Sequence, residues 1–187
     1  YWTRRGDEEL SRRDRDKLVP GRLCMSRADL WICAQRDVTS HFLEGLKEPM
    51  VITCMDKSNN EIKGICDEHG YEYVWFNPGY HKTFTGGMYN LLYMAKDHLD
   101  RGFDVVVHCR AGLHRAATVV TVLNAHFRSI SFLQSLEELR EIRAVEVEDF
   151  ITRHPGPHFD KWNERCLSGR NPYHLEAPIM PGNYATV

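Results

Sequence analysis

Two short apolar runs, Val51-Ile-Thr and Val105-Val-Val, constrain the fold most strongly. Neighbouring side chains of a strand point to opposite faces of a sheet, so apolar residues at successive positions indicate that both faces are covered. The two runs therefore predict central strands of a sheet that carries helices on both sides.

Other runs rich in β-branched, aromatic and sulfur-containing residues predict further strands. The predicted strands are Arg22 to Met25, Leu30 to Ala34, Met50 to Met55, Tyr71 to Phe76 and Phe103 to His108. Stretches of helical periodicity alternate with them or follow them, at Ser40 to Lys47, Asn59 to His69, Gly87 to Asp100, Ala116 to Arg128 and from Ser131 onward. This order predicts an α/β fold with a central, mostly parallel sheet of about five strands flanked by helices.

The last two predicted helices have different surroundings. The segment Ala116 to Arg128 is apolar nearly all round, which is typical of a buried helix. In the next helix, Ser131 and Gln134 have capping-box spacing. Its predicted core stripe is Phe132, Leu133, Leu136, Leu139 and Ile142, and its predicted outer face is Glu137, Glu138, Arg140, Glu141 and Arg143.

Length and composition favour one soluble domain. The 187 residues are 42% hydrophobic and 27% charged, as in ordinary globular proteins. We expect a charged, solvated arm at 1–19, the folded domain at 20–162 and a Pro-containing tail at 163–187. No apolar run is long enough to span a membrane, and the first residues lack the apolar core of a secretory signal, so we expect a cytoplasmic protein.

Charge and metal-ligand patterns exclude several partners. The net charge of −2 gives no general attraction to nucleic acid or to an anionic membrane. The 10 histidines and the cysteines form no Cys/His cluster at zinc spacing, so we predict no metal site. No Cys-x-x-Cys pair occurs among the cysteines; we expect reduced thiols, with a disulfide framework as the alternative, at Cys24, Cys33, Cys54, Cys66, Cys109 and Cys166.

The segment His108-Cys-Arg-Ala-Gly-Leu-His-Arg115 is the candidate reactive site. It joins a predicted strand to a predicted buried helix. A loop in this context turns backbone N–H groups inward, and the helix N-terminus adds partial positive charge, so a phosphate fits there. The same field favours a nucleophilic thiolate at Cys109. Arg115 can hold two phosphoryl oxygens with its planar fork, and Gly112 permits a turn that other residues would strain. The alternative is a buried structural thiol beside a surface arginine.

This segment resembles the His-Cys-x5-Arg signature of the protein tyrosine phosphatase superfamily, and the compact length is similar to its dual-specificity branch. The resemblance spans about Pro20 to Trp162. It implies a cysteinyl-phosphate intermediate that water hydrolyses, with no metal or organic cofactor, and a role for His108 in orienting and tuning the thiolate.

Two positions depart from the family pattern. The family usually places Ser or Thr directly after the arginine, where its hydroxyl helps the thiolate leave, but this chain has Ala116. The general acid is usually an Asp on a loop that follows a strand upstream of the cysteine. Here that place holds Asn77 and His81, with no carboxylate between Glu72 and Asp97, and Asp56 after an earlier strand is a weaker candidate.

Three hypotheses follow from these departures. The chain is an enzyme whose acid is His81 or a carboxylate from elsewhere, an enzyme for leaving groups that need no proton, or a phosphate-binding scaffold with little turnover. The expected phosphate-binding loop is Arg110, Ala111, Gly112, Leu113 and His114.

Arg110 and His114 bear on the substrate. They add positive charge beside Arg115, which suits a substrate with several phosphates. The loop also looks like that of plant and fungal atypical dual-specificity phosphatases, which implies inositol pyrophosphates as substrates. Phosphoprotein, other inositol phosphates and triphosphate-ended RNA are further candidates. In the alternative arrangement, Arg110 faces solvent and His114 packs as a neutral imidazole.

Overall fold

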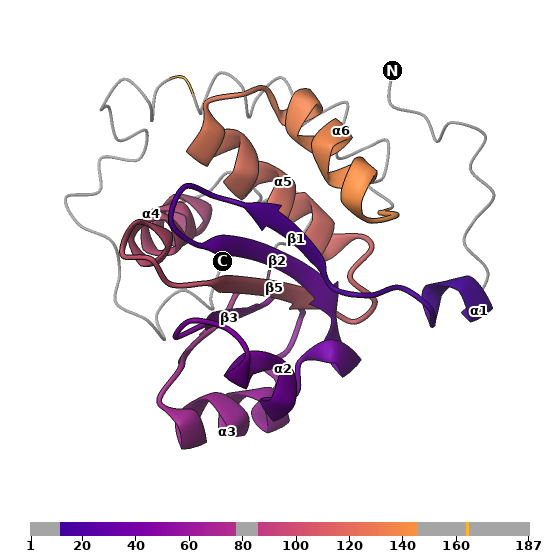
Figure 1. The fold of residues 1–187 in the computed structure, drawn as a ribbon, viewed down its shortest axis with the longest axis vertical. Helices are drawn as coiled ribbons and strands as arrows, with labels where there is room; N and C mark the ends of the chain where they lie inside the picture. The colour runs from indigo at the N-terminus through magenta and orange to yellow at the C-terminus, as the bar shows by residue number, and fades with distance from the viewer. Residues whose placement is uncertain (1–11, 78–85, 146–163, 165–187) are drawn as a thin grey trace.

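The structure is a computed structural model that describes residues 12–77, 86–145 and 164. In the described part, strands and helices alternate and two helices close the chain (Figure 1). The strands are β1 Gly21–Cys24, β2 Asp29–Ala34, β3 Met50–Thr53, β4 Glu72–Trp75 and β5 Val105–Cys109. The helices are α1 Arg12–Arg15, the 3₁₀ helix η1 Gln35–Asp37, α2 Ser40–Glu44, α3 Asn60–His69, α4 Gly86–Asp100, α5 Arg115–Arg128 and α6 Phe132–Ile142.

The strands form one sheet in the order β1-β2-β5-β3-β4. Only β1 is antiparallel to its neighbour, and β2, β5, β3 and β4 run parallel. Thr53 of β3 pairs with His108 of β5 and with Trp75 of β4, while Ala34 of β2 pairs with Cys109. The carboxyl ends of four strands therefore meet at one edge of the sheet, where ligands of open α/β sheets bind.

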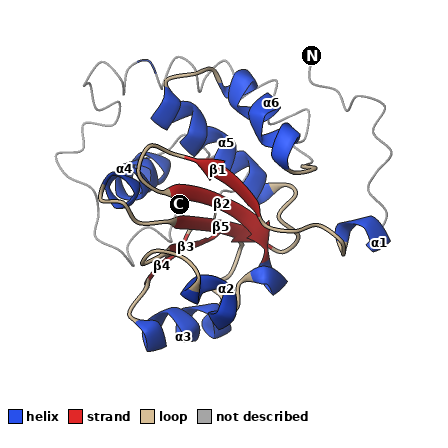
Figure 2. Ribbon diagram, viewed as in Figure 1, coloured by secondary structure: helices blue, strands red, loops and turns tan. Residues whose placement is uncertain are grey.

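Helices cover both faces of the sheet (Figure 2). Val105 and Val107 of β5 pack in the core beneath α4, α5 and α6, whereas Val106 packs in the smaller core beneath α2 and α3. This alternation is why β5 is apolar at successive positions. The prediction of a layered α/β fold with a mostly parallel sheet is confirmed.

Side-chain caps begin three helices, and the one at Ser131 was predicted. Thr39, Asn59 and Ser131 accept hydrogen bonds from the backbone N–H groups of Phe42, Ile62 and Gln134 at 3.1, 3.0 and 3.1 Å. Gly102, which follows α4, has a φ of 88°, a conformation that glycine adopts without strain.

Two residues at the end of α6 correct the sequence analysis. Ile142, placed in the core stripe, is 42% exposed, and Arg143, placed on the outer face, is only 4% exposed. The reason is that α6 ends at Ile142 and Arg143 takes an extended backbone with φ −155° and ψ 137°. Helical periodicity no longer sets the direction of its side chain.

Candidate active site

Cys109 is the last residue of β5 and lies at the carboxyl edge of the sheet with an exposed fraction of 3%. The neighbouring strands hold it in place. The N–H of Cys54, just after β3, donates to the carbonyl of His108 at 2.8 Å, and Ala34 pairs with Cys109 from β2. The predicted nucleophile therefore sits on the most central strand, at the base of the loop that follows.

His108 is fully buried directly before Cys109. Its Nδ1 lies 3.1 Å from the carbonyl oxygen of Cys109, and its Nε2 lies 2.7 Å from the hydroxyl of Thr53. Burial lowers the pKa of His108 from 6.5 to about 4, so the ring is neutral. Because a carbonyl only accepts, Nδ1 carries the hydrogen, and Nε2 accepts from Thr53. The imidazole thus links β3 to the backbone of the predicted nucleophile.

Consecutive carbonyls of the loop after Cys109 are engaged by protein donors. The carbonyl of Cys109 accepts from the His108 ring, as described above. The carbonyl of Arg110 accepts from the N–H of Gln35 at 3.1 Å. The next two carbonyls, of Ala111 and Gly112, accept from the Arg143 guanidinium at 3.1 and 3.3 Å. In a trans peptide the N–H points away from the C=O. The N–H groups of residues 110–113 are therefore turned away from these donors, and none of them has an acceptor among the described residues.

Gly112 is where the loop comes closest to the body of the protein. Its φ is 69°, and a Cβ there would lie 2.5 Å from the carbonyl oxygen of Cys33 and 2.8 Å from Nη2 of Arg143. Both the backbone conformation and the close approach require glycine. This confirms the predicted turn and adds a packing reason for it.

Arg143 contacts the loop, and the sequence did not single it out. Its guanidinium donates to the carbonyls of Ala111, Gly112 and Val19, which joins the loop to the chain just before β1. Burial lowers the pKa of Arg143, yet an arginine stays charged in proteins. The only signal in the sequence was its place one residue beyond the last turn of a predicted helix.

Arg115 is the first residue of α5, so its side chain leaves the loop at a helix N-terminus. It is partly exposed, and its Nη1 lies 4.0 Å from Oδ1 of Asp56, the third residue after β3. Ala116 is fully buried directly after it. The hydroxyl of Thr118 donates to the carbonyl of His114 at 3.0 Å and is thus committed to the helix.

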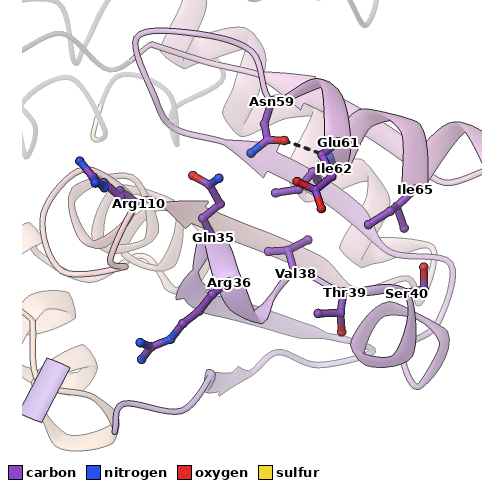
Figure 3. Close-up of a pocket in the computed structure, with 10 residues that line it drawn as sticks. All are labelled: Gln35, Arg36, Val38, Thr39, Ser40, Asn59, Glu61, Ile62, Ile65 and Arg110. Atoms are coloured by element: carbon purple, nitrogen blue, oxygen red, sulfur yellow. Dashed lines mark hydrogen bonds between the residues drawn. The ribbon is translucent and has the colours of Figure 1, made fainter. Parts of the chain in front are cut away.

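A pocket of about 500 Å³ lies beside the loop. The segment from Gln35 to Ser40 and the start of α3 form its walls, and Arg110 lies at the opposite end from Ser40 and Ile65 (Figure 3). Arg110 is exposed and His114 is half-buried. Of the two predicted basic residues, Arg110 is the one that borders this pocket.

The described residues include only the start of the loop on which we predicted the general acid. Asn77 is half-buried, two residues after β4, and β4 is one strand further from Cys109 than β3 is. His81 lies outside the described residues. The structure therefore brings Asp56, Cys109 and Arg115 to one edge of the sheet and leaves the prediction for His81 untested.

The neighbouring thiols differ from Cys109 in their surroundings. Burial, reinforced by Cys109 itself, raises the pKa of Cys54 well above its usual range. Burial and the carboxylate of Asp37 likewise raise the pKa of Cys33. Both thiols stay protonated at neutral pH and lack the field of a helix N-terminus.

The described residues contain neither a membrane-spanning helix nor a cluster of metal ligands. No helix in that part of the chain is long and apolar enough to cross a membrane. No group of three or more His, Cys, Asp or Glu side chains there could hold a metal ion.

Comparisons with known proteins bear on the fold. No family model and no curated protein matches the sequence. Human DUSP28 superposes with a TM-score of 0.58 at 13% identity, over 80% of this chain and 96% of that chain. PTPMT1 superposes with a TM-score of 0.57 at 16% identity, over 75% and 95% of the two chains. The phosphatase PTP-2 of Cydia pomonella gives 0.56 at 18% identity, over 71% and 86%.

The chain has the dual-specificity phosphatase fold. The predicted resemblance is confirmed at the level of architecture. Within this phosphatase fold, the segment from His108 to Arg115 occupies the turn between the central strand and the buried helix.

Proposed function

We propose that the chain is a cysteine-dependent phosphatase that hydrolyses phosphoesters through a cysteinyl-phosphate intermediate. One observation carries the proposal: protein donors bind the consecutive carbonyls of the loop after Cys109, and the N–H groups of residues 110–113 point away from these donors. A thiol at the base and a guanidinium at the end of such a nest suit a tetrahedral dianion.

Each residue has a role in this reaction. The Cys109 thiolate attacks phosphorus while Arg115 and the loop N–H groups hold the non-bridging oxygens, where charge resides during transfer. His108 is neutral and binds the carbonyl of Cys109, so it orients the nucleophile rather than pairing with it as a cation. Water then attacks the phosphocysteine and releases phosphate.

Hydrolysis of the phosphocysteine, the second step, lacks the hydroxyl group that usually helps the thiolate leave. With Ala116 after the arginine and the Thr118 hydroxyl bonded to His114, neither residue offers a free hydroxyl to the departing sulfur. We therefore expect hydrolysis of the intermediate to limit the rate on good substrates. An early burst of leaving group, followed by a slower steady rate, is the expected kinetic signature.

For the substrate, we propose a phosphorylated molecule that carries more than one anionic group. Arg110 lies beside the nest and at one end of the 500 Å³ pocket, so a second phosphate or carboxylate can reach it while the first is bound at Cys109. PTPMT1, one of the structures that superpose on this chain, has been solved in complex with PI(5)P. Inositol phosphates therefore come before phosphopeptides and triphosphate-ended RNA in our order of candidates.

The test is a turnover screen of the whole chain on inositol phosphates, phosphopeptides, triphosphate-ended RNA and an aryl phosphate, with Cys109→Ser as the blank. We expect multiple turnovers that Cys109→Ser abolishes. Arg110→Ala should lower kcat/KM on an inositol polyphosphate about tenfold or more and change little on the aryl phosphate. Equal effects on both substrates would exclude Arg110 from substrate selection.

A phosphate-binding scaffold is the second candidate. Asn77 at the acid loop and Ala116 after the arginine favour it, because both departures weaken turnover without weakening phosphate binding. Phosphopeptide binding without turnover on any substrate in the screen would support the scaffold and exclude the enzyme.

A further inference from the structure

A phosphatase needs a proton donor for poor leaving groups, and the loop that usually supplies an Asp for this purpose has no carboxylate. Asn77 is an amide, and no carboxylate occurs between Glu72 and Asp97. A carboxylic acid for the leaving oxygen must therefore come from another strand end at the same edge of the sheet.

Sheet topology places Asp56 at that edge. Strand β3 lies between β5 and β4, and Thr53 pairs with both His108 and Trp75. Asp56 follows Thr53 by three residues in the loop that leaves β3. Asp56 thus follows β3, which is the direct neighbour of β5, the strand that ends in Cys109. Asn77 follows β4, which is one strand further from β5.

The backbone before Asp56 is held by hydrogen bonds, and the Asp56 side chain is exposed at the edge of the sheet. The N–H of Cys54 donates to the carbonyl of His108 at 2.8 Å, and the indole N–H of Trp75 donates to the carbonyl of Met55 at 2.9 Å. The Asp56 side chain is 74% exposed, and its Oδ1 lies 4.0 Å from Nη1 of Arg115. The carboxyl group is therefore next to the guanidinium proposed to hold the phosphoryl group.

We propose that Asp56 is the general acid of the reaction. This inference rests on the proposed phosphatase function. When a phosphoryl dianion binds, the Arg115 fork turns to its oxygens, and the Asp56 carboxyl beside Arg115 can then face the ester oxygen.

The proton balance closes over two steps. In the first, the S–P bond forms, the P–O bond to the leaving group breaks, and the Asp56 proton passes to the leaving oxygen. In the second, the Asp56 carboxylate takes a proton from the attacking water, the O–P bond forms and the S–P bond breaks. Inorganic phosphate leaves, and the Cys109 thiolate and the Asp56 acid are restored.

Asp56→Asn tests the assignment, because it keeps the size of the side chain and removes its acidic proton. On phenyl phosphate, a poor leaving group, we expect kcat/KM to fall by about 100-fold or more. On 4-nitrophenyl phosphate, whose leaving group needs no proton, it should stay within a few-fold of the wild-type value. The fall of the phenyl phosphate rate toward high pH should also vanish in the variant.

Three controls accompany this experiment. Asp67→Asn makes the same chemical change at an exposed carboxylate of α3 that pairs with Lys63, and it should leave both rates unchanged. Asp56→Glu should restore part of the phenyl phosphate rate. Vanadate inhibition should be as tight in Asp56→Asn as in the wild-type protein, since the phosphate nest is intact.

The outcomes separate the two proposals. If Asp56→Asn lowers both rates equally and weakens vanadate inhibition, Asp56 only orients Arg115 and the assignment is wrong. If it changes neither rate in an active wild-type protein, the acid lies elsewhere and the assignment is also wrong. If the wild-type protein and Cys109→Ser are equally inert on both esters, the proposed function itself fails, and the role of Asp56 fails with it.

Discussion

Burying a guanidinium costs free energy unless its N–H groups form hydrogen bonds. Arg143 forms them with backbone carbonyls from two parts of the chain that are distant in sequence. Two of its acceptors, Ala111 and Gly112, belong to the loop that follows Cys109, and the third is Val19. Because each loop N–H points away from the carbonyl of its own peptide, Arg143 determines on which side the nest opens. We infer that Arg143 is a positioning residue that acts through the loop.

Arg143→Lys tests this role, because lysine keeps the charge and loses the planar fork. A single ammonium cannot reproduce the guanidinium's set of contacts, so we expect vanadate and phosphate to bind about tenfold more weakly or worse. Arg140→Lys on α6 is the matched control. Binding constants from inhibition, with the thermal midpoint recorded alongside, provide the measurement. If Arg143→Lys lowers only the thermal midpoint, Arg143 is structural and does not shape the nest.

Among the elements, α6 connects stability to the site. The helix begins at the Ser131 cap and ends one residue before Arg143. Its apolar residues, including Phe132, Leu136 and Leu139, pack in the core beneath one face of the sheet. The packing of α6 therefore fixes the position of Arg143, which directly follows the helix and binds the loop.

The cap of α6 allows a prediction about this element. Ser131→Ala removes the acceptor for the Gln134 N–H, and we expect it to lower the free energy of unfolding by about 1 kcal/mol. Ser131→Asp keeps an acceptor and should cost much less. Turnover should stay unchanged in both, because the cap lies at the end of the helix away from Arg143. Denaturant unfolding and steady-state rates check this, and a loss of turnover in Ser131→Ala would contradict it.

Periodicity predicted every strand of the described sheet and the helices α2 to α6 to within a few residues. This worked because β5, for example, is apolar at successive positions and α3 begins at an Asn cap and ends before Gly70. The nest around Cys109 could also be predicted, since a strand, a loop and a helix N-terminus are adjacent in the chain. Arg143 could not, because its contacts with the loop join residues distant in sequence. Asp56 was only the weaker candidate for the acid, because its proximity to Arg115 also joins residues distant in sequence.

For the whole molecule, buried imidazoles link stability to pH. The pKa of His108 is about 4 in the folded protein and 6.5 without the effect of burial. Burial also lowers the pKa of His98, whereas hydrogen bonds to Ile65 and Glu44 raise that of His69. The first two contributions make the protein less stable in acid, and the third opposes them.

We predict that the free energy of unfolding falls as the pH is lowered from 6.5 to 4, because only the unfolded chain then protonates His108. Below pH 4 both states bind the proton and this loss levels off, at about 3 kcal/mol in total. In His108→Gln, the slope of stability against pH between these values should be shallower by about one proton. His41→Gln, at an exposed position on α2, is the matched control and should leave the slope unchanged. Denaturant unfolding at several pH values measures both, and equal slopes in His108→Gln and the wild-type protein would show that burial of His108 does not set the acid sensitivity.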